Sequence, residues 1–160
     1  MDALLTAIVI WLSANYDLPE TFTPPRIERV PSIEMASLRY KGLLSSHQRE
    51  VSVIQTQEAS IEKMRGIVAF YNDQTKTIYI SDTWAGRTAA ELSVLVHEMV
   101  HHLQYVAGTR YECPAEREKL AYEAQEKWLG LFGLNLESEF EINGLALLIS
   151  TSCAMEIGLH

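Results

Sequence analysis

Residues 88–108 read TAAELSVLVHEMVHHLQYVAG, and this stretch decides the fold of the chain. Thr88 and Glu91 form a capping-box sequence, in which each side chain can bond the backbone N–H of the other at the start of a helix. Gly108 is the residue type that most often ends a helix, because glycine adopts the left-handed conformation without strain. The stretch therefore predicts a long helix that begins after Thr88 and ends at about Ala107.

Helical periodicity gives this helix two faces. The apolar residues gather on one side of the helical wheel, which predicts a core face made of Leu92, Leu95, Met99, Leu103 and Val106. His97 and His101 lie on the opposite side, and their spacing of four residues places them one turn apart on the same face. The plainer alternative for this pair is two solvated surface histidines.

His97, Glu98 and His101 make up the motif His-Glu-x-x-His. Two imidazoles one turn apart can bind the same Zn²⁺, each at about 2.0–2.1 Å. Glu98 lies roughly 100° round the helix from His97, so it can reach a water at the metal without replacing a histidine. The motif therefore predicts Zn²⁺ bound by His97 and His101, with Glu98 as the catalytic general base.

A catalytic zinc site needs a third protein ligand, and the next predicted helix supplies acidic candidates. This helix is expected from Pro114 to about Phe132, followed by Gly133, and a short turn lets it run antiparallel to the histidine helix. Glu118 falls within its apolar arc, where a buried carboxylate needs a partner such as a metal. Glu118 is therefore the expected third ligand, with Glu116 as the main competitor. The other acidic candidates, on the opposite side of the helix, are Glu123 and Glu126.

The rest of the chain predicts smaller elements. Two β-rich runs at 67–71 and 77–80, separated by a polar loop, predict a hairpin. The other expected elements are a first helix at 1–16, a short strand at 27–30, a short helix at 32–40 capped by Ser32, and a last helix near 141–152. Residues 41–50 are expected in a polar loop, and residues 51–66 fit either a strand or a helix. This order of elements predicts one α+β domain over residues 1–160.

The composition excludes two kinds of protein. Lys and Arg number 13 and Asp and Glu number 21, which gives a formal net charge of −8. Phosphate backbones repel such an acidic chain, so no nucleic-acid partner is expected. No apolar run reaches the roughly 20 residues that a membrane span needs. The apolar run Ala3–Leu12 is expected as a helix of the fold rather than a signal peptide, since Asp2 replaces the basic residue of such a signal.

The chain has two cysteines, Cys113 and Cys153, which allow one disulfide at most. The sequence leaves a bridge and two free thiols equally open. A bridge would indicate an oxidising compartment.

The pattern around the motif resembles a known group of enzymes. A His-Glu-x-x-His helix with a downstream helical glutamate is similar to the zincin metallopeptidases, in the gluzincin branch whose third ligand is a glutamate. More narrowly, Trp84–Trp128 resembles a family of small bacterial proteins of unknown function. The matching residues are SVLVHEMVHHLQ at 93–104, CPAE at 113–116, and Ala121, Tyr122, Gln125 and Trp128. The first helix and the hairpin are similar to that family as well.

This resemblance implies a zincin-like fold, in which the histidine helix packs under a small antiparallel sheet and is followed by the third-ligand helix and a C-terminal helix. It also implies a zinc hydrolase, without naming a substrate. Domains of this family often follow a secretory leader, which implies that Met1 is an added start, that Cys113 and Cys153 form a disulfide, and that the location is periplasmic or secreted. Without these features the expected location is cytoplasmic.

One position departs from the gluzincin pattern. Well-known gluzincins carry an acid one turn after the ligand glutamate, whereas this chain has Tyr122 there. Further candidates are His102 and Tyr122 for catalysis, Tyr105 and Tyr111 for hydrogen bonds to a tetrahedral intermediate, and Gln104 and Gln125 for orienting the ligands. Packing is the alternative role for each of the aromatic candidates. His47 and His160 are expected to be solvated.

These residues together predict a zinc-dependent hydrolase, namely a metallopeptidase that acts on a peptide or protein substrate. In zincins an edge strand pairs with an extended substrate, and the resemblance makes the strand at 77–81 the candidate for this role here. One alternative is a non-catalytic zinc-binding module that uses the same ligands, and another is a helical domain with a chance motif. The sequence does not determine the oligomeric state.

Overall fold

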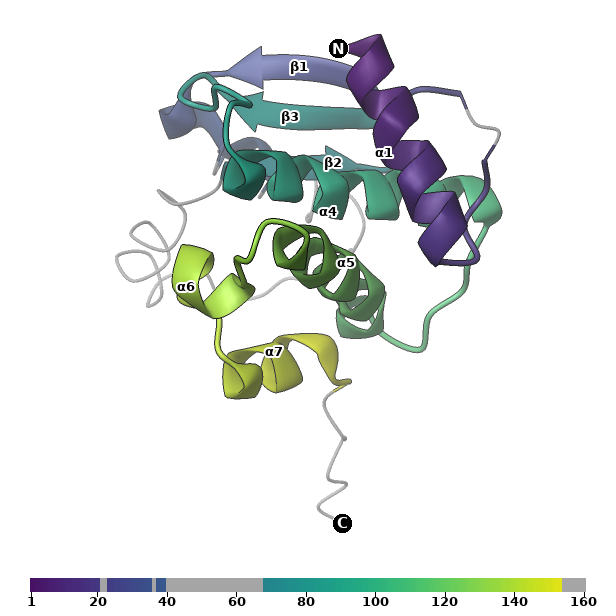
Figure 1. The fold of residues 1–160 in the computed structure, drawn as a ribbon. Helices are drawn as coiled ribbons and strands as arrows, with labels where there is room; N and C mark the ends of the chain where they lie inside the picture. The colour runs from purple at the N-terminus through teal and green to yellow at the C-terminus, as the bar shows by residue number, and fades with distance from the viewer. Residues whose placement is uncertain (21–22, 36, 40–67, 154–160) are drawn as a thin grey trace, which may run out of the picture. The chain divides into compact units, whose positions relative to one another are not determined.

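The computed structural model describes residues 1–20, 23–35, 37–39 and 68–153 (Figure 1). In chain order the elements are α1 (Asp2–Asn15), β1 (Arg26–Val30), β2 (Ala69–Asn72), β3 (Thr77–Ser81), α4 (Ala89–Ala107), α5 (Pro114–Gly130), α6 (Leu136–Phe140) and α7 (Gly144–Thr151). Residues 32–35 and 37–39 are helical as well. These elements confirm the predicted α+β class. The predictions for residues 41–66, His47 and His160 lie outside the described residues.

The chain divides into two compact units. The helical unit comprises residues 1–22 and 88–160, and the sheet unit comprises residues 23–87. The whole His-Glu-x-x-His motif and all candidate third ligands belong to the helical unit. The predictions of a single domain and of a histidine helix packed under a sheet stay predictions.

The sheet unit contains a three-stranded sheet in the order β1-β3-β2. β2 and β3 form the predicted hairpin, in which Phe70 lies opposite Tyr79 with the ring centroids 5.0 Å apart. β1 pairs with β3 in parallel, with Ile27 opposite Ile78, so the prediction of a purely antiparallel sheet is wrong. A short turn forces β2 and β3 to be antiparallel, whereas the long stretch of chain after β1 allows the crossover of about a dozen residues or more that a parallel pair needs.

The strand order also overturns the expected role of residues 77–81. β3 lies between β1 and β2, and each of these neighbours forms ladder hydrogen bonds with it. A strand that is paired on both sides has no free edge to offer to a substrate strand. The prediction that residues 77–81 bind substrate as an edge strand is therefore wrong.

α4 has the predicted bounds for the predicted reasons. Thr88 is its N-cap in a complete capping box with Glu91. Gly108 follows its last residue with φ of 65°, in the left-handed region that glycine adopts without strain. The predicted core face is buried at Leu95, Met99 and Leu103, whereas Val106 in the last turn is exposed.

The opposite face of α4 is buried as well. His97 is 8 % exposed and His101 is 5 % exposed, which excludes two solvated surface histidines. α5 packs on this face and runs antiparallel to α4, because Ser93 near the start of α4 contacts Gln125, whereas Gln104 near its end contacts Arg117. The predicted antiparallel pair of helices is therefore present.

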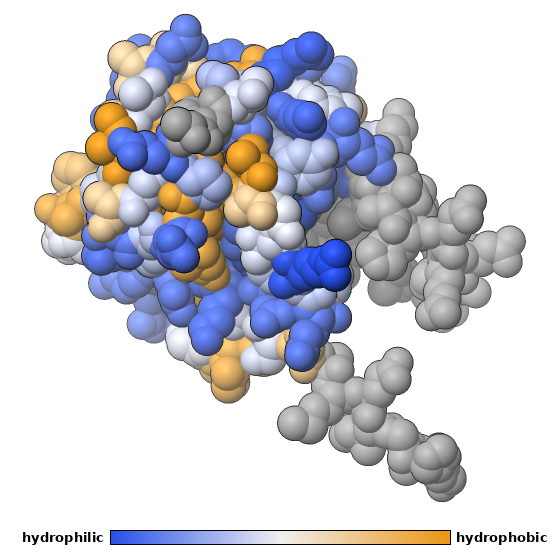
Figure 2. Space-filling view, turned by 90° about the vertical axis from the view of Figure 1, so that its right-hand side faces the viewer, coloured by the Kyte–Doolittle hydropathy of each residue, from blue (hydrophilic) through white to orange (hydrophobic). Residues whose placement is uncertain are grey.

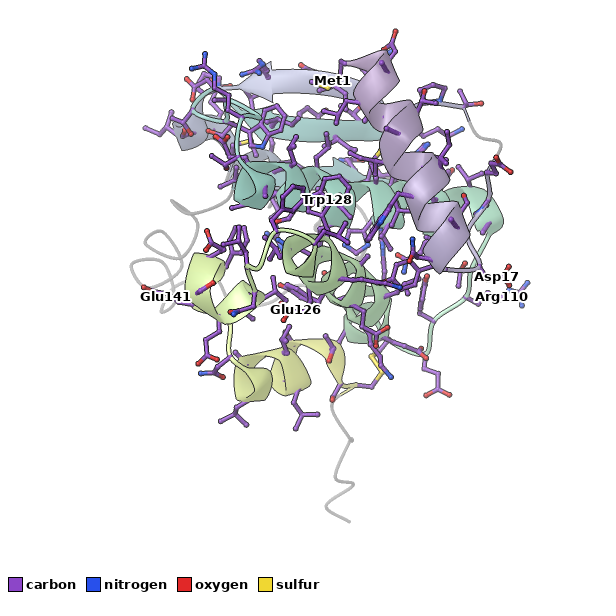
Figure 3. All side chains as sticks on the ribbon, in the orientation of Figure 1. Met1, Asp17, Arg110, Glu126, Trp128 and Glu141 are labelled. Carbon is purple, nitrogen blue, oxygen red and sulfur yellow. A yellow bond between two sulfur atoms is a disulfide. The ribbon has the colours of Figure 1, made fainter. Side chains whose placement is uncertain are left out.

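Three further helices, α1, α6 and α7, belong to the helical unit. α1 contacts α5 through Trp11 and Trp128, whose ring centroids are 5.4 Å apart at 90°. Figure 3 labels Trp128. α6 was not among the predicted elements, because five residues are too few for a helical period to stand out. It begins at the N-cap Asn135, whose side chain accepts a hydrogen bond from the backbone N–H of Ser138.

The last helix, α7, lies within the predicted range 141–152. A disulfide joins Cys153, two residues after the end of α7, to Cys113, the N-cap of α5, with the Cα atoms 5.7 Å apart (Figure 3). The structure thus selects the bridge from the two alternatives that the sequence left open. α7 also leaves apolar side chains exposed, namely Leu145, Leu148 and Ile149.

On the side of the molecule drawn in Figure 2, hydrophilic residues predominate and apolar residues form patches between them. Among the described residues, no helix combines the length and the apolar character that crossing a membrane would require.

Candidate metal centre

Three side chains from α4 and α5 bring their ligand atoms together. His97 Nε2 lies 3.1 Å from Glu118 Oε2, and His101 Nε2 lies 3.3 Å from the same oxygen. The two Nε2 atoms are 3.2 Å apart, so the three atoms form a nearly equilateral triangle. Within the described part of the chain, this is the only group of three or more His, Cys, Asp or Glu side chains that could hold a metal ion.

The triangle fits a tetrahedral ion. Ligand atoms at about 2.0–2.1 Å from a tetrahedral Zn²⁺ are separated by about 3.3–3.4 Å from one another. The three observed separations lie between 3.1 and 3.3 Å. Two imidazole nitrogens and one carboxylate oxygen are also a common donor set for catalytic zinc. The residues present therefore fit this metal in both spacing and chemistry.

Helix geometry explains how the ligands meet. His97 and His101 lie one turn apart on α4, and Glu118 lies in the second turn of the antiparallel α5. The side chain of Glu118 is 34 % exposed, so the triangle has one accessible corner. Glu116, the competing candidate, instead accepts a hydrogen bond of 2.7 Å from the backbone N–H of Glu112. The structure thus brings Glu118 to the histidines and uses Glu116 in the turn before α5.

A chain of hydrogen bonds orients His97. Ser93 Oγ donates to the carbonyl of Ala90 at 2.7 Å, and the same oxygen accepts from Gln125 Nε2 at 3.2 Å. The amide of Gln125 therefore turns its Oε1 toward His97 Nδ1, at 3.0 Å. Since an amide oxygen only accepts, His97 Nδ1 is the donor and the lone pair of a neutral ring lies on Nε2.

Gln104 holds His101 in a similar way. Its Nε2 donates to the backbone carbonyl of Arg117 at 3.1 Å, which leaves Oε1 facing His101 Nδ1 at 3.1 Å. Each glutamine thus contacts the Nδ1 of one of the two histidines, and the expectation that they orient metal ligands stays a prediction. Arg117 was not among the predicted site residues, because a helical arginine is ordinarily solvated, yet its Nε also lies 3.1 Å from His101 Nδ1.

The pKa values of Glu118 and His97 are both shifted by their mutual contact. Burial alone would raise the pKa of Glu118, but hydrogen bonds from His101 and His97, together with their charges, hold it well below its usual range. Burial alone would lower the pKa of His97, but the hydrogen bond to Glu118 and the charges of Glu98 and Glu118 outweigh burial and raise it. The carboxylate of Glu118 is therefore ionised at neutral pH.

The other expected catalytic residues lie around this group. Glu98 is buried beside His97, close enough for its charge to raise the pKa of that ring. The half-buried ring of Tyr122 meets the His97 ring edge-on, with the centroids 4.7 Å apart. His102 is fully buried and is not a member of the metal-capable group. Of the two other tyrosines, Tyr105 is exposed and Tyr111 is half-buried.

Comparison with known proteins identifies a family without a described activity. No curated protein matches the chain, and no solved structure matches it. A family model described as a domain of unknown function (DUF6647) matches residues 1–158. Since this match covers nearly the whole chain, the protein belongs to the DUF6647 family.

Proposed function

We propose that this protein is a zinc-dependent hydrolase that cleaves amide bonds in a peptide or protein substrate. The triangle formed by His97 Nε2, His101 Nε2 and Glu118 Oε2 carries this proposal, because its edges of 3.1–3.3 Å match the spacing of ligands around tetrahedral zinc. The buried carboxylate of Glu98, next to the first ligand in the chain, supports catalysis rather than metal storage. The resemblance to zincin metallopeptidases points to the same chemistry.

The residues have separate tasks in this reaction. Zinc, when bound by the three ligands, would supply a Lewis acid that makes a water more acidic and polarises a carbonyl. Glu98 takes the proton of the attacking water and returns it to the leaving amine. Gln125 and Gln104 keep the lone pairs of the two histidine rings directed at the metal position.

The disulfide supports a proposal on location. A bridge between Cys113 and Cys153 persists in oxidising surroundings and is rare where glutathione keeps thiols reduced. We therefore place the protein in the periplasm or outside the cell. Thiol titration of unreduced protein from its natural compartment tests this: two reactive thiols per chain would contradict it.

The experiment that tests the enzyme proposal combines metal content with activity. Wild type, Glu98→Gln and Glu116→Gln are assayed by elemental analysis and against a broad library of peptides. We expect one zinc per chain in all three proteins, and peptide cleavage that a chelator abolishes and Zn²⁺ restores. Glu98→Gln should lower kcat by orders of magnitude, since an amide cannot accept the proton of water, whereas Glu116→Gln should stay near wild type.

Two outcomes would overturn the enzyme proposal in different ways. If wild type and Glu98→Gln both bind zinc fully but are equally silent on every amide, the non-catalytic zinc-binding module replaces the hydrolase. If wild type takes up no zinc, the metal site itself is refuted.

A further inference from the structure

His101 Nδ1 has two neighbours, one of which requires a proton on this nitrogen and the other a lone pair. Gln104 Oε1 lies 3.1 Å away and can only accept a hydrogen bond, which requires a proton on Nδ1. Arg117 Nε lies 3.1 Å away and can only donate, which requires a lone pair on Nδ1. One ring nitrogen of a neutral histidine cannot satisfy both neighbours at once.

Turning the amide of Gln104 does not remove this conflict. The opposite orientation would point Nε2 at His101 and leave Oε1 facing the backbone carbonyl of Arg117, which accepts a hydrogen bond of 3.1 Å from Nε2 as the amide stands. Two acceptors would then face each other without a proton. The main chain of Arg117 therefore keeps Gln104 in place as an acceptor, while the side chain of Arg117 competes with it as a donor.

The other ring nitrogen of His101 decides between the two neighbours. The ionised carboxylate of Glu118 can only accept a hydrogen bond, and its Oε2 lies 3.3 Å from His101 Nε2. Without a metal between them, this contact is favourable only if His101 carries its proton on Nε2. That tautomer leaves Nδ1 as an acceptor, as the Arg117 contact demands.

Metal binding requires the other tautomer. A zinc ligand coordinates through a lone pair, so His101 must free Nε2 and carry its proton on Nδ1, where Gln104 accepts it. The proton moves between two nitrogens of one ring, and the net charge of the ring does not change. His97 needs no such exchange, because its Nδ1 donates to Gln125 with or without metal, and only a proton that Nε2 donates to Glu118 has to leave.

We propose that Arg117 is a positioning residue that holds His101 in the metal-free tautomer and thereby sets the affinity for zinc, while Gln104 holds the metal-binding tautomer. This inference rests on the proposed zinc site and adds a control of metal loading to it. Arg117 acts through His101, since the contact runs from its Nε to the nitrogen remote from the ligand triangle. Zinc must displace this charge-assisted hydrogen bond in order to bind.

The test reads the tautomer and the affinity separately. Long-range proton–nitrogen NMR spectra of the metal-free protein, recorded above the titration range of the histidines, distinguish a proton on Nε2 from one on Nδ1. Competition with a chromophoric chelator measures the affinity for Zn²⁺. The variants are Arg117→Met, which removes the donor, and Arg110→Met, which removes an exposed arginine in the turn between α4 and α5 (Figure 3).

We expect wild type and Arg110→Met to carry the His101 proton on Nε2, and Arg117→Met to carry it on Nδ1. Arg117→Met should bind zinc roughly tenfold more tightly or better, the size expected for loss of one charge-assisted hydrogen bond from the competing state. Arg110→Met should change the affinity much less.

Three results would overturn the inference. The first is a wild-type spectrum with the His101 proton already on Nδ1, which needs no variant and therefore holds even if Arg117→Met fails to fold. The second is an unchanged tautomer in Arg117→Met, and the third is an equal gain of affinity in both variants, which would make the effect one of net charge. If no protein binds zinc, the proposed function fails, and the metal-free spectra still decide whether Arg117 selects the tautomer.

Discussion

The two ends of the α4–α5 pair support their histidines differently. At one end, a chain of hydrogen bonds runs from His97 through Gln125 and Ser93 to the carbonyl of Ala90. Every donor in this chain meets an acceptor. At the other end, Gln104 and Arg117 meet at a single nitrogen of His101. The same motif thus contains one histidine whose Nδ1 faces a single acceptor and one whose Nδ1 faces both an acceptor and a donor. Equal spacing on a helix does not make two histidines equivalent, because their outer partners belong to another helix.

Removing a ligand gives the largest expected effect and removes the difference between the two ends. His97→Ala, His101→Ala and Glu118→Ala should each abolish stoichiometric zinc, because each deletes one of three ligands. Glu116→Ala is the matched control on α5 and should retain zinc, since its carboxylate bonds to the turn instead. Elemental analysis after dialysis measures this. Full zinc in any of the three ligand variants, or equal losses in the two glutamate variants, would contradict the site.

Replacing the two glutamines should have an intermediate effect on zinc affinity, and it tests whether the two ends of the α4–α5 pair differ. Gln125→Leu and Gln104→Leu should each weaken zinc binding by about 10- to 100-fold, the usual cost of losing an outer partner of a ligand. The loss from Gln104→Leu should shrink when Arg117→Met is present, because the competitor is then gone, whereas the loss from Gln125→Leu should not. Chelator competition on both double-mutant cycles measures this. Additive effects in both cycles would mean that the two ends do not differ.

The smallest expected effect is on the pH dependence of stability without metal. The raised pKa of His97 stabilises the fold fully below the unfolded value of about 6.5, and this contribution is lost as pH rises through the folded pKa. The lowered pKa of Glu118 stabilises the fold above its unfolded value of about 4.3, and this contribution is lost only as pH falls through the folded pKa. The pair should therefore stabilise the metal-free protein most between these two values.

Denaturant unfolding with a chelator present, at a series of pH values, measures this dependence. Wild type should lose stability as pH rises above about 6.5, and His97→Ala should lose less over the same range. With excess Zn²⁺ the trend should reverse, because zinc binds histidine rings that have released their protons. A chelated His97→Ala protein with the same slope as wild type would show that His97 is not the group responsible.

Much of the helical unit follows from local rules. The ends of α4 depend on Thr88, Glu91 and Gly108, whose side chains or backbone conformation act within one turn of the helix. The choice of Glu118 over Glu116 follows from helical phase, because only a residue on the inward arc of α5 can reach α4. α5 itself ends at Gly130, two residues before the predicted end.

The sheet was harder to predict, and the two wrong predictions about it have the same cause. β3 is a β-rich run with a clear hairpin partner, yet nothing in its residues shows that β1 occupies its other side. The parallel pairing joins Arg26 to Thr77 across about 50 residues, and no turn signal spans such a distance. Both errors, the antiparallel sheet and the free edge at 77–81, follow from this one missing contact.

The sequence by itself determined the histidine helix, the two histidines on one of its faces and the acidic residue on the next helix that can join them. Capping and the helical period decide these features, and both act between residues a few positions apart. Only the tertiary structure decided which atoms meet the outer nitrogens of the ligands, that Cys113 and Cys153 are joined, and that β1 lies beside β3. Each of these is a contact between residues far apart in the chain, which packing creates and local sequence does not encode.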